Sequence, residues 1–156
     1  MRTVFAFALI LIGMTTASFA SIGKANAESE ADSTRNERLT KQMELATTFA
    51  KIEGMKSVVR HLAANGLACE TAADCTSLAM GKRACGGPTS YVVTSFTNPS
   101  LSALQESIQL VTKAEIEANT KFGLASICSL IMPPRVACHA NQSGERRCVN
   151  TEEAAE

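Results

Sequence analysis

Six cysteines have the most reactive side chains of this chain, and their spacing limits the chemistry open to them. They are Cys69, Cys75, Cys85, Cys128, Cys138 and Cys148. Zinc sites usually take two ligands from one tight turn with C-x2-C to C-x4-C spacing, and no two of these cysteines are that close. We therefore predict no metal ion and no cofactor. An even number of cysteines favours disulfide bonds, provided that the chain leaves the cytosol.

The N-terminus carries the pattern of a secretory signal peptide over residues 1–27. Arg2 gives a basic start, an apolar run covers Val4–Ile12, and Ala-Asn-Ala at 25–27 forms an A-x-A cleavage site. Polar residues stop the apolar run short of the about 20 residues that a membrane span needs. We predict cleavage after Ala27, export to the periplasm or the medium, and no stable membrane insertion afterwards. In that compartment the six cysteines predict three disulfide bonds, in one of fifteen possible pairings.

The charge balance excludes partners that are recognised through a strong electrostatic field. Lys and Arg total 15, Asp and Glu also total 15, and loss of Arg2 and Lys24 with the signal peptide leaves a small acidic excess. Such a chain does not attract nucleic acid or an anionic membrane over long distances. The expected partner is a protein or another component of the cell envelope.

Sequence motifs for catalysis are missing. A thiol enzyme would need an unbridged cysteine next to His61 or His139, and the G-x-S-x-G motif of serine hydrolases does not occur. The glutamates Glu106, Glu115 and Glu117 all fall on one predicted helix, which does not suit a two-carboxylate glycosidase site. We therefore predict no catalytic residues, and we keep a cell-envelope hydrolase or thiol enzyme as an alternative.

One basic loop has the features of a protease-inhibitor loop. The stretch IMPPRVAC places Pro133, Pro134, Arg135 and Val136 just before Cys138. A rigid inhibitory loop holds a substrate-like residue extended before binding, so little conformational entropy is lost when the protease binds. Presentation of Arg135 in this way is the first alternative function, ahead of the hydrolase or thiol enzyme. In the competing interpretation these are ordinary solvated loop residues.

Two helices are predicted from apolar periodicity and end signals. The polar residues 28–37 are expected to form a flexible lead-in. Apolar side chains then recur at helical spacing over residues 38–65. The second helix is expected to have Asn98 as its N-cap, Pro99 in its first position and Gly123 at its end.

The first predicted strand follows a glycine and proline corner. Gly86, Gly87 and Pro88 form a turn because glycine accepts positive φ and proline fixes its own φ. The β-branched and aromatic run Tyr91–Phe96 is typical of a half-buried strand. Residues 69–85 are expected to form a loop that contains a short apolar piece.

The C-terminal part is expected to contain short strands. Residues 127–132 form one, which ends because two prolines follow it. Residues 136–139 and 146–149 form a hairpin that places Cys138 nearly opposite Cys148, and a disulfide bond between these two is geometrically possible. The predicted fold is a single α+β domain over residues 38–150, in which two helices pack on a small antiparallel sheet stabilised by disulfides. Residues 151–156 are expected to be a disordered tail.

Parts of residues 69–149 resemble a loose set of exported bacterial cysteine-containing proteins that have no established function. The resemblance lies in CETAADCTSLAMGKRACGGPTSYVV, in ICSLIMPPRVAC and in the closing RRCV. The matching residues are Cys69, Cys75, Cys85, Gly86, Gly87, Pro88, Tyr91, Pro133, Pro134, Cys138 and Cys148. The set often has a bulky aromatic residue where this chain has Thr89, and it lacks the long first helix. The resemblance implies an exported, disulfide-held α+β domain and transfers no activity.

Taken together, these patterns predict an exported, non-catalytic protein that binds a macromolecular partner.

Overall fold

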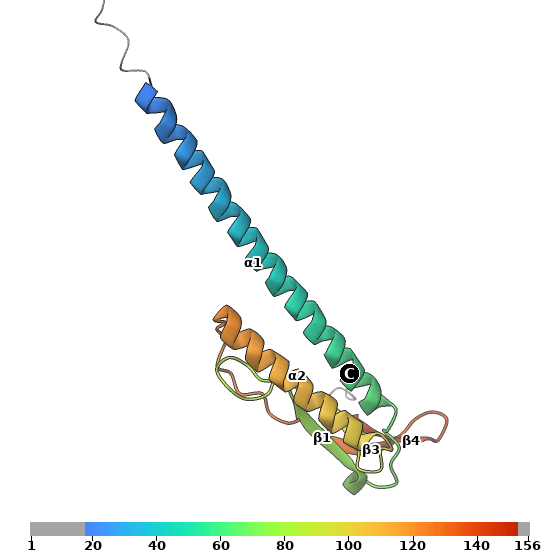
Figure 1. Cartoon of the computed structure of the whole chain (residues 1–156). Helices are drawn as coiled ribbons and strands as arrows, with labels where there is room; N and C mark the ends of the chain where they lie inside the picture. Colours follow the sequence, from blue (N-terminus) through green and yellow to red (C-terminus); the bar gives the residue numbers. More distant parts are fainter. Residues whose placement is uncertain (1–17, 153–156) are drawn as a thin grey trace, which may run out of the picture. The chain divides into compact units, whose positions relative to one another are not determined.

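A computed structural model describes residues 18–152 of the chain, which divides into two compact units, Met1–Glu44 and Leu45–Glu156. The long helix α1 begins in the first unit and ends in the second (Figure 1). The helices and strands are α1 (Ser18–Ala64), the 3-10 helix η1 (Ala72–Asp74), β1 (Cys75–Met80), β2 (Ser90–Ser95), α2 (Leu101–Phe122), β3 (Val136–Ala140) and β4 (Arg146–Asn150).

The described part of the first unit is helical. Residues 28–37, which were expected to be a flexible lead-in, belong to α1. They contain no glycine or proline, so a helix that is already formed downstream extends through them with one more hydrogen bond per residue. Ala27, the predicted cleavage position, also lies in α1. The apolar run of the predicted signal peptide lies outside the described residues, and cleavage stays a prediction.

The core of the second unit lies between α1, α2 and the first sheet. Val59 of α1 and Leu104 and Val111 of α2 are fully buried, and Met80 of β1 and Val92 of β2 pack against them. Burial of an aliphatic side chain of this size contributes about 1.5–3 kcal/mol. These contacts hold both helices on the sheet, as the helical spacing of apolar residues predicted.

Helix α2 begins at Leu101, two residues later than predicted, because Asn98 has a different role from the expected N-cap. Asn98 is buried, and its Nδ2 donates to the Leu62 carbonyl at 3.1 Å and to Thr94 Oγ1 at 2.9 Å. Its Oδ1 accepts from the Ser100 amide at 2.8 Å, so the side chain organises the turn before the helix. The predicted C-terminal end is confirmed, with Gly123 in the left-handed conformation at φ 60°.

The first sheet pairs β1 with β2 in antiparallel register. Strand β2 covers nearly the predicted residues, and Gly86 and Gly87 in the turn before it have φ values of 106° and 73°. Strand β1 lies where a loop was expected. Its sequence, CTSLAM, mixes small and polar residues and has little strand propensity of its own. Pairing with β2 and burial of Cys75 and Met80 make it a strand.

The second sheet is the predicted hairpin of β3 and β4. Cys138 is paired with Cys148 in the register, as expected. In the turn, Asn141 Oδ1 accepts from the amides of Ser143 at 3.0 Å and Glu145 at 2.9 Å. The fold class is therefore confirmed as disulfide-stabilised α+β, with the antiparallel strands divided between two small sheets. The strand predicted at 127–132 is wrong, because those residues have no regular structure.

Candidate functional site

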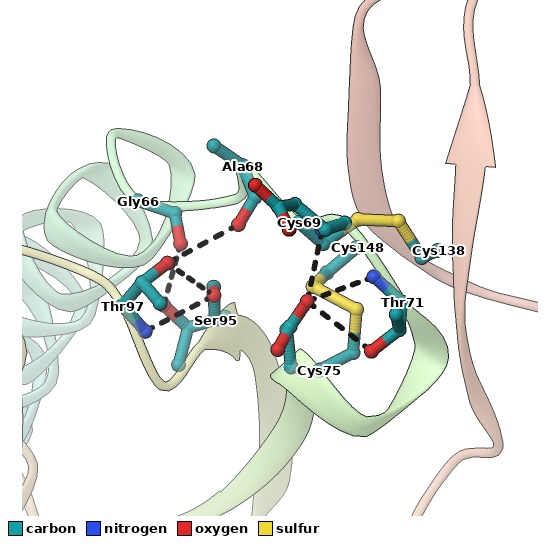
Figure 2. The surroundings of a disulfide bond; sticks show 12 residues. Gly66, Ala68, Cys69, Thr71, Cys75, Ser95, Thr97, Cys138 and Cys148 are labelled. Carbon is teal, nitrogen blue, oxygen red and sulfur yellow. Dashed lines mark hydrogen bonds between the residues drawn. A yellow bond between two sulfur atoms is a disulfide. The ribbon is translucent and has the colours of Figure 1, made fainter.

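Two disulfide bonds join the second sheet to the segment that enters β1. Cys69 is bonded to Cys138 and Cys75 to Cys148, and Figure 2 shows the two bonds next to each other. The possible Cys138–Cys148 bond is therefore not formed. It would only have joined two strands that the backbone already pairs, whereas the observed bonds attach the hairpin to the start of β1. Their sequence separations of 69 and 73 residues make each bond a strong constraint on the unfolded chain.

Hydrogen bonds fix the turn between the bonded cysteines. Asp74 Oδ2 accepts from the amides of Thr71 at 2.8 Å and Glu70 at 2.9 Å, and these bonds lower the pKa of the Asp74 carboxyl. The Ser95 amide donates to the Gly66 carbonyl at 2.9 Å on the other side of the bonds. This end of the unit is held by both covalent bonds and backbone hydrogen bonds (Figure 2).

The sulfur atoms of Cys69, Cys75 and Cys148 lie within 4.8 Å of one another, which is close enough for metal ligands. All three are in disulfide bonds. A disulfide sulfur carries no thiolate charge for a metal ion, since thiolate is the form that binds metal. This sulfur cluster is therefore a covalent cross-link.

The expectation of three disulfides is corrected to two, because Cys85 and Cys128 carry unbonded thiols. Both are exposed, and both line a cavity of about 250 Å³. The residues around the two cysteines in this cavity are Arg83, Gly86, Gly87, Pro88, Ser129, Leu130 and Ile131. No histidine is among these described lining residues, so the cysteine and histidine pair of a thiol enzyme is not assembled there.

The two histidines lie on other elements. His61 is exposed near the end of α1, and its Nε2 lies 3.1 Å from Asn65 Nδ2. His139 is exposed on β3, where it is paired with Arg147 of β4.

The chain between α2 and β3, residues 124–135, has no regular secondary structure. We call it the 124–135 segment. Its side chains Ile127, Leu130 and Met132 are 84%, 80% and 67% exposed. Large apolar side chains on a protein surface leave unfavourable area in contact with water, and a group of them marks an interaction site more often than a lone one does.

Polar contacts hold the first half of the 124–135 segment against the glycine corner. The Cys85 amide donates to Ser126 Oγ at 3.1 Å. Arg83 Nη2 donates to the Ser129 carbonyl, and its Nη1 lies 3.4 Å from Ser129 Oγ. The corner that the sequence predicted therefore supports the segment as well as turning the chain into β2.

Hydrogen bonds in the second half of the 124–135 segment hold the residues that lead into the β3–β4 hairpin. The Tyr91 hydroxyl donates to the Ile131 carbonyl at 3.5 Å. The Arg135 carbonyl accepts from the Thr151 amide at 3.0 Å and from Thr151 Oγ1 at 3.3 Å. Thr151 was expected to begin a disordered tail, and these two bonds tie it down instead. Residues 153–156 of that tail lie outside the described part.

The predicted inhibitory loop, residues 133–136, covers the end of the 124–135 segment and the first residue of β3. Pro133 and Arg135 are exposed, Pro134 is half-buried, and Val136 is the first residue of β3, paired with Asn150. Pro134 also lines a mainly apolar cavity of about 450 Å³. The other lining residues are Arg60, Ala63, Ala64, Leu67, Tyr91, Val92, Val93, Cys148, Val149 and Asn150.

An ion pair between a buried carboxylate and a half-buried lysine, which the sequence did not reveal, holds the start of the corner. Glu115 of α2 is buried, its Oε1 lies 2.8 Å from Lys56 Nζ of α1, and its Oε2 accepts from the Lys82 amide at 2.6 Å and from the Thr89 hydroxyl. Burial lowers the pKa of Lys56, but hydrogen bonds to Glu115 and to exposed Glu53 outweigh it, and the pKa is raised.

Gly81 makes room for this buried carboxylate. A Cβ at residue 81 would lie 2.2 Å from Glu115 Oε2, and the residue also has φ +79°. Both facts require glycine there. The carboxylate is therefore a structural anchor of the corner.

Comparison with protein-family models, with curated proteins and with solved structures gives no match to this chain. The resemblance to exported bacterial cysteine-containing proteins stays a prediction. In the part of the chain that the structure describes, no helix has an apolar stretch long enough to span a bilayer.

Proposed function

We propose that this chain is an exported, non-catalytic protein that binds a macromolecular partner through the 124–135 segment. The observation that carries the proposal is the exposure of Ile127, Leu130 and Met132, at 84%, 80% and 67%. These side chains lie on a segment that is fixed at both ends.

Preorganisation supports a binding role. A segment that is already held by hydrogen bonds at Ser126, Ser129, Ile131 and Arg135 loses little further conformational entropy when it meets a partner. Its apolar side chains then supply the favourable term, about 25 cal/mol per Å² of apolar surface removed from water. Exposed apolar residues on mobile loops would not have this advantage.

Two observations support export. The sequence of residues 1–27 has the features of a signal peptide. The structured region contains two disulfide bonds, which are formed and kept mainly in oxidising compartments. The proposed compartment is the periplasm or the medium.

The geometry gives the inhibitor alternative less support. The carbonyl before a scissile bond must be free to enter the oxyanion hole of a serine protease. The Arg135 carbonyl instead accepts two hydrogen bonds from Thr151. Val136, which would follow the scissile peptide bond, is already paired with Asn150 in the β3–β4 sheet. Inhibition through Arg135 would need these contacts to break first.

The test is site-specific photo-cross-linking of the full-length chain in its own cells. A photoreactive amino acid replaces Leu130 or Met132, and matched controls replace Leu110 or Ile116, which are exposed apolar residues of α2. The proposal expects a discrete covalent adduct from the first two positions and none from the controls. Equal adducts at all four positions, or no adduct at any, would contradict it.

Export is tested separately by fractionating the same cells. The proposal expects a shortened chain in the periplasm or the medium. An uncleaved chain that is retained in the cytosol would overturn the export part and leave the binding part to the cross-linking result.

A further inference from the structure

The two cysteines outside the disulfide bonds form a pair. Cys85 lies in the turn after β1 and Cys128 lies in the 124–135 segment, and both line the 250 Å³ cavity. Both are exposed. The pair is therefore open to small reagents from solvent, whereas the sulfur atoms of Cys75 and Cys148 are buried.

Ser126 positions both members of the pair. Its hydroxyl accepts from the Cys85 amide at 3.1 Å, and its carbonyl lies 3.8 Å from Cys128 Sγ. The guanidinium of Arg83, fixed by Ser129, lies on the same cavity. The two thiols thus lie on one cavity, each beside Ser126, with the positive charge of Arg83 on the same cavity.

The two thiols differ in acidity. The hydrogen bond from Cys128, followed by that from Ser126 and the charge of Arg83, lowers the pKa of Cys85. The same contact raises the pKa of Cys128. Cys85 is the thiol that loses its proton first, and thiolate is the nucleophilic form of cysteine.

We propose that Cys85 and Cys128 form a thiol–disulfide exchange site, in which Cys85 attacks an external disulfide and Cys128 resolves the product. The substrate class is a small disulfide such as oxidised glutathione, or an exposed disulfide of another protein. The reaction is stoichiometric, with one external disulfide reduced for each protein thiol pair, so it does not conflict with a non-catalytic binding role. The proposal is independent of the identity of the binding partner.

The exchange has two steps. In the first, the Cys85 thiolate bonds to one sulfur of the external disulfide, and the other sulfur leaves as a thiolate. In the second, Cys128 gives up its proton and attacks the Cys85 sulfur of the mixed disulfide, which releases the second external thiol. The protein pair is oxidised to a Cys85–Cys128 disulfide, and the external disulfide is reduced to two thiols.

The new bond would join the glycine corner to the 124–135 segment covalently. Hydrogen bonds of Ser126 and Ser129 hold that junction in the thiol form. Exchange would therefore change how firmly the exposed apolar side chains are held, while the two disulfides at the other end stay closed.

The test uses the full mature chain with oxidised and reduced glutathione. The protein is first treated with reduced glutathione and desalted, then exposed to oxidised glutathione, alkylated and mapped by peptide mass spectrometry. We expect reduced glutathione to expose Cys85 and Cys128 alone to alkylation. We expect oxidised glutathione to protect both together in a monomer.

Two variants assign the roles. Cys128→Ser is expected to accumulate a stable glutathione adduct on Cys85, and Cys85→Ser to leave Cys128 largely unmodified. The bonds Cys69–Cys138 and Cys75–Cys148 serve as internal controls that stay closed throughout. The proposal is overturned if both variants form adducts at the same rate, if oxidation joins two molecules, or if reduced glutathione cannot open the pair.

Discussion

The two ends of the second unit use cysteine in opposite ways. At one end Cys75 and Cys148 are buried in a disulfide bond next to the Cys69–Cys138 bond. At the other end Cys85 and Cys128 are exposed thiols, and hydrogen bonds hold the 124–135 segment there. Cysteine cross-links the fold at one end and stays accessible to solvent at the other.

The difference follows from the amount of apolar surface that each end buries. The cysteine-bonded end has only a small apolar cluster, made of the disulfides with Leu67, Val93 and Val136 around them. Covalent bonds compensate for that small cluster. The end near the thiols is supported by the larger core of α1, α2 and the first sheet and by the Glu115 ion pair. It can therefore present a surface without a covalent lock.

The largest expected effect is loss of the buried disulfide. The double change Cys75→Ala and Cys148→Ala should lower the free energy of unfolding by about 4 kcal/mol, because a bond across a long loop restricts the unfolded chain most. Urea unfolding followed by circular dichroism measures it. The matched control, Cys85→Ala with Cys128→Ala in glutathione-reduced protein, should change stability little. Equal losses of unfolding free energy in both variants would contradict the proposed difference between the two ends.

The next largest effect tests whether an ion pair stabilises the end of the unit where the two cysteines are unbonded. Glu115→Gln removes the buried carboxylate charge that pairs with half-buried Lys56. It should destabilise the unit by about 2 kcal/mol, the contribution of a hydrogen bond to a charged group, because Lys56 keeps its contact with Glu53. Thermal unfolding measures it, with Glu117→Gln on the exposed face of α2 as the control. A loss no larger than that of the control would show that the pair does not anchor the corner.

A smaller effect concerns acid sensitivity at the disulfide end. Hydrogen bonds from Thr71 and Glu70 lower the pKa of Asp74 below its ordinary value of 3.8. A lowered folded-state pKa adds stability above the unfolded pKa, and this stability is lost as the pH falls through the folded pKa. Asp74→Asn should therefore be less stable than the parent at pH 6, with the difference shrinking below about pH 4. A difference that is constant from pH 6 to pH 2 in thermal unfolding would refute this assignment.

The smallest expected effect on stability comes from the exposed apolar side chains. The triple change Ile127→Ser, Leu130→Ser and Met132→Ser should alter the unfolding free energy by less than about 0.5 kcal/mol per site, because exposed side chains contribute little to the folded state. The same variant should lose the partner cross-link. A large loss of stability would mean that these residues belong to the packing of the protein and do not form a free surface.

Local signals in the sequence predicted several parts of the fold. The apolar face and glycine end of α2, the turn at Gly86 and Gly87, and the β3–β4 hairpin each depend on neighbouring residues. Strand β1 was missed because its own residues favour no structure and its pairing with β2 decides it. The helical conformation of 28–37 does not follow from the sequence pattern, because a polar stretch without apolar periodicity is typical of flexible segments as well as of exposed helices.

The candidate site was harder to predict, because it depends on contacts between residues far apart in the chain. Residues 127–132 are expected from the sequence to form a strand, and nothing local shows that their apolar side chains face solvent. Glu115 is a buried anchor only because Lys56, Lys82 and Thr89 meet around it. The pairing of six cysteines likewise cannot be read from spacing alone.

Disulfide mapping of the native protein under graded reduction tests the central contrast most directly. Non-reduced peptide mass spectrometry at increasing concentrations of reduced glutathione should show Cys69–Cys138 and Cys75–Cys148 intact while Cys85 and Cys128 are alkylated. If Cys138 is found bonded to Cys148, or if the buried bonds open at the same glutathione concentration as the exposed pair, the two ends do not differ as described.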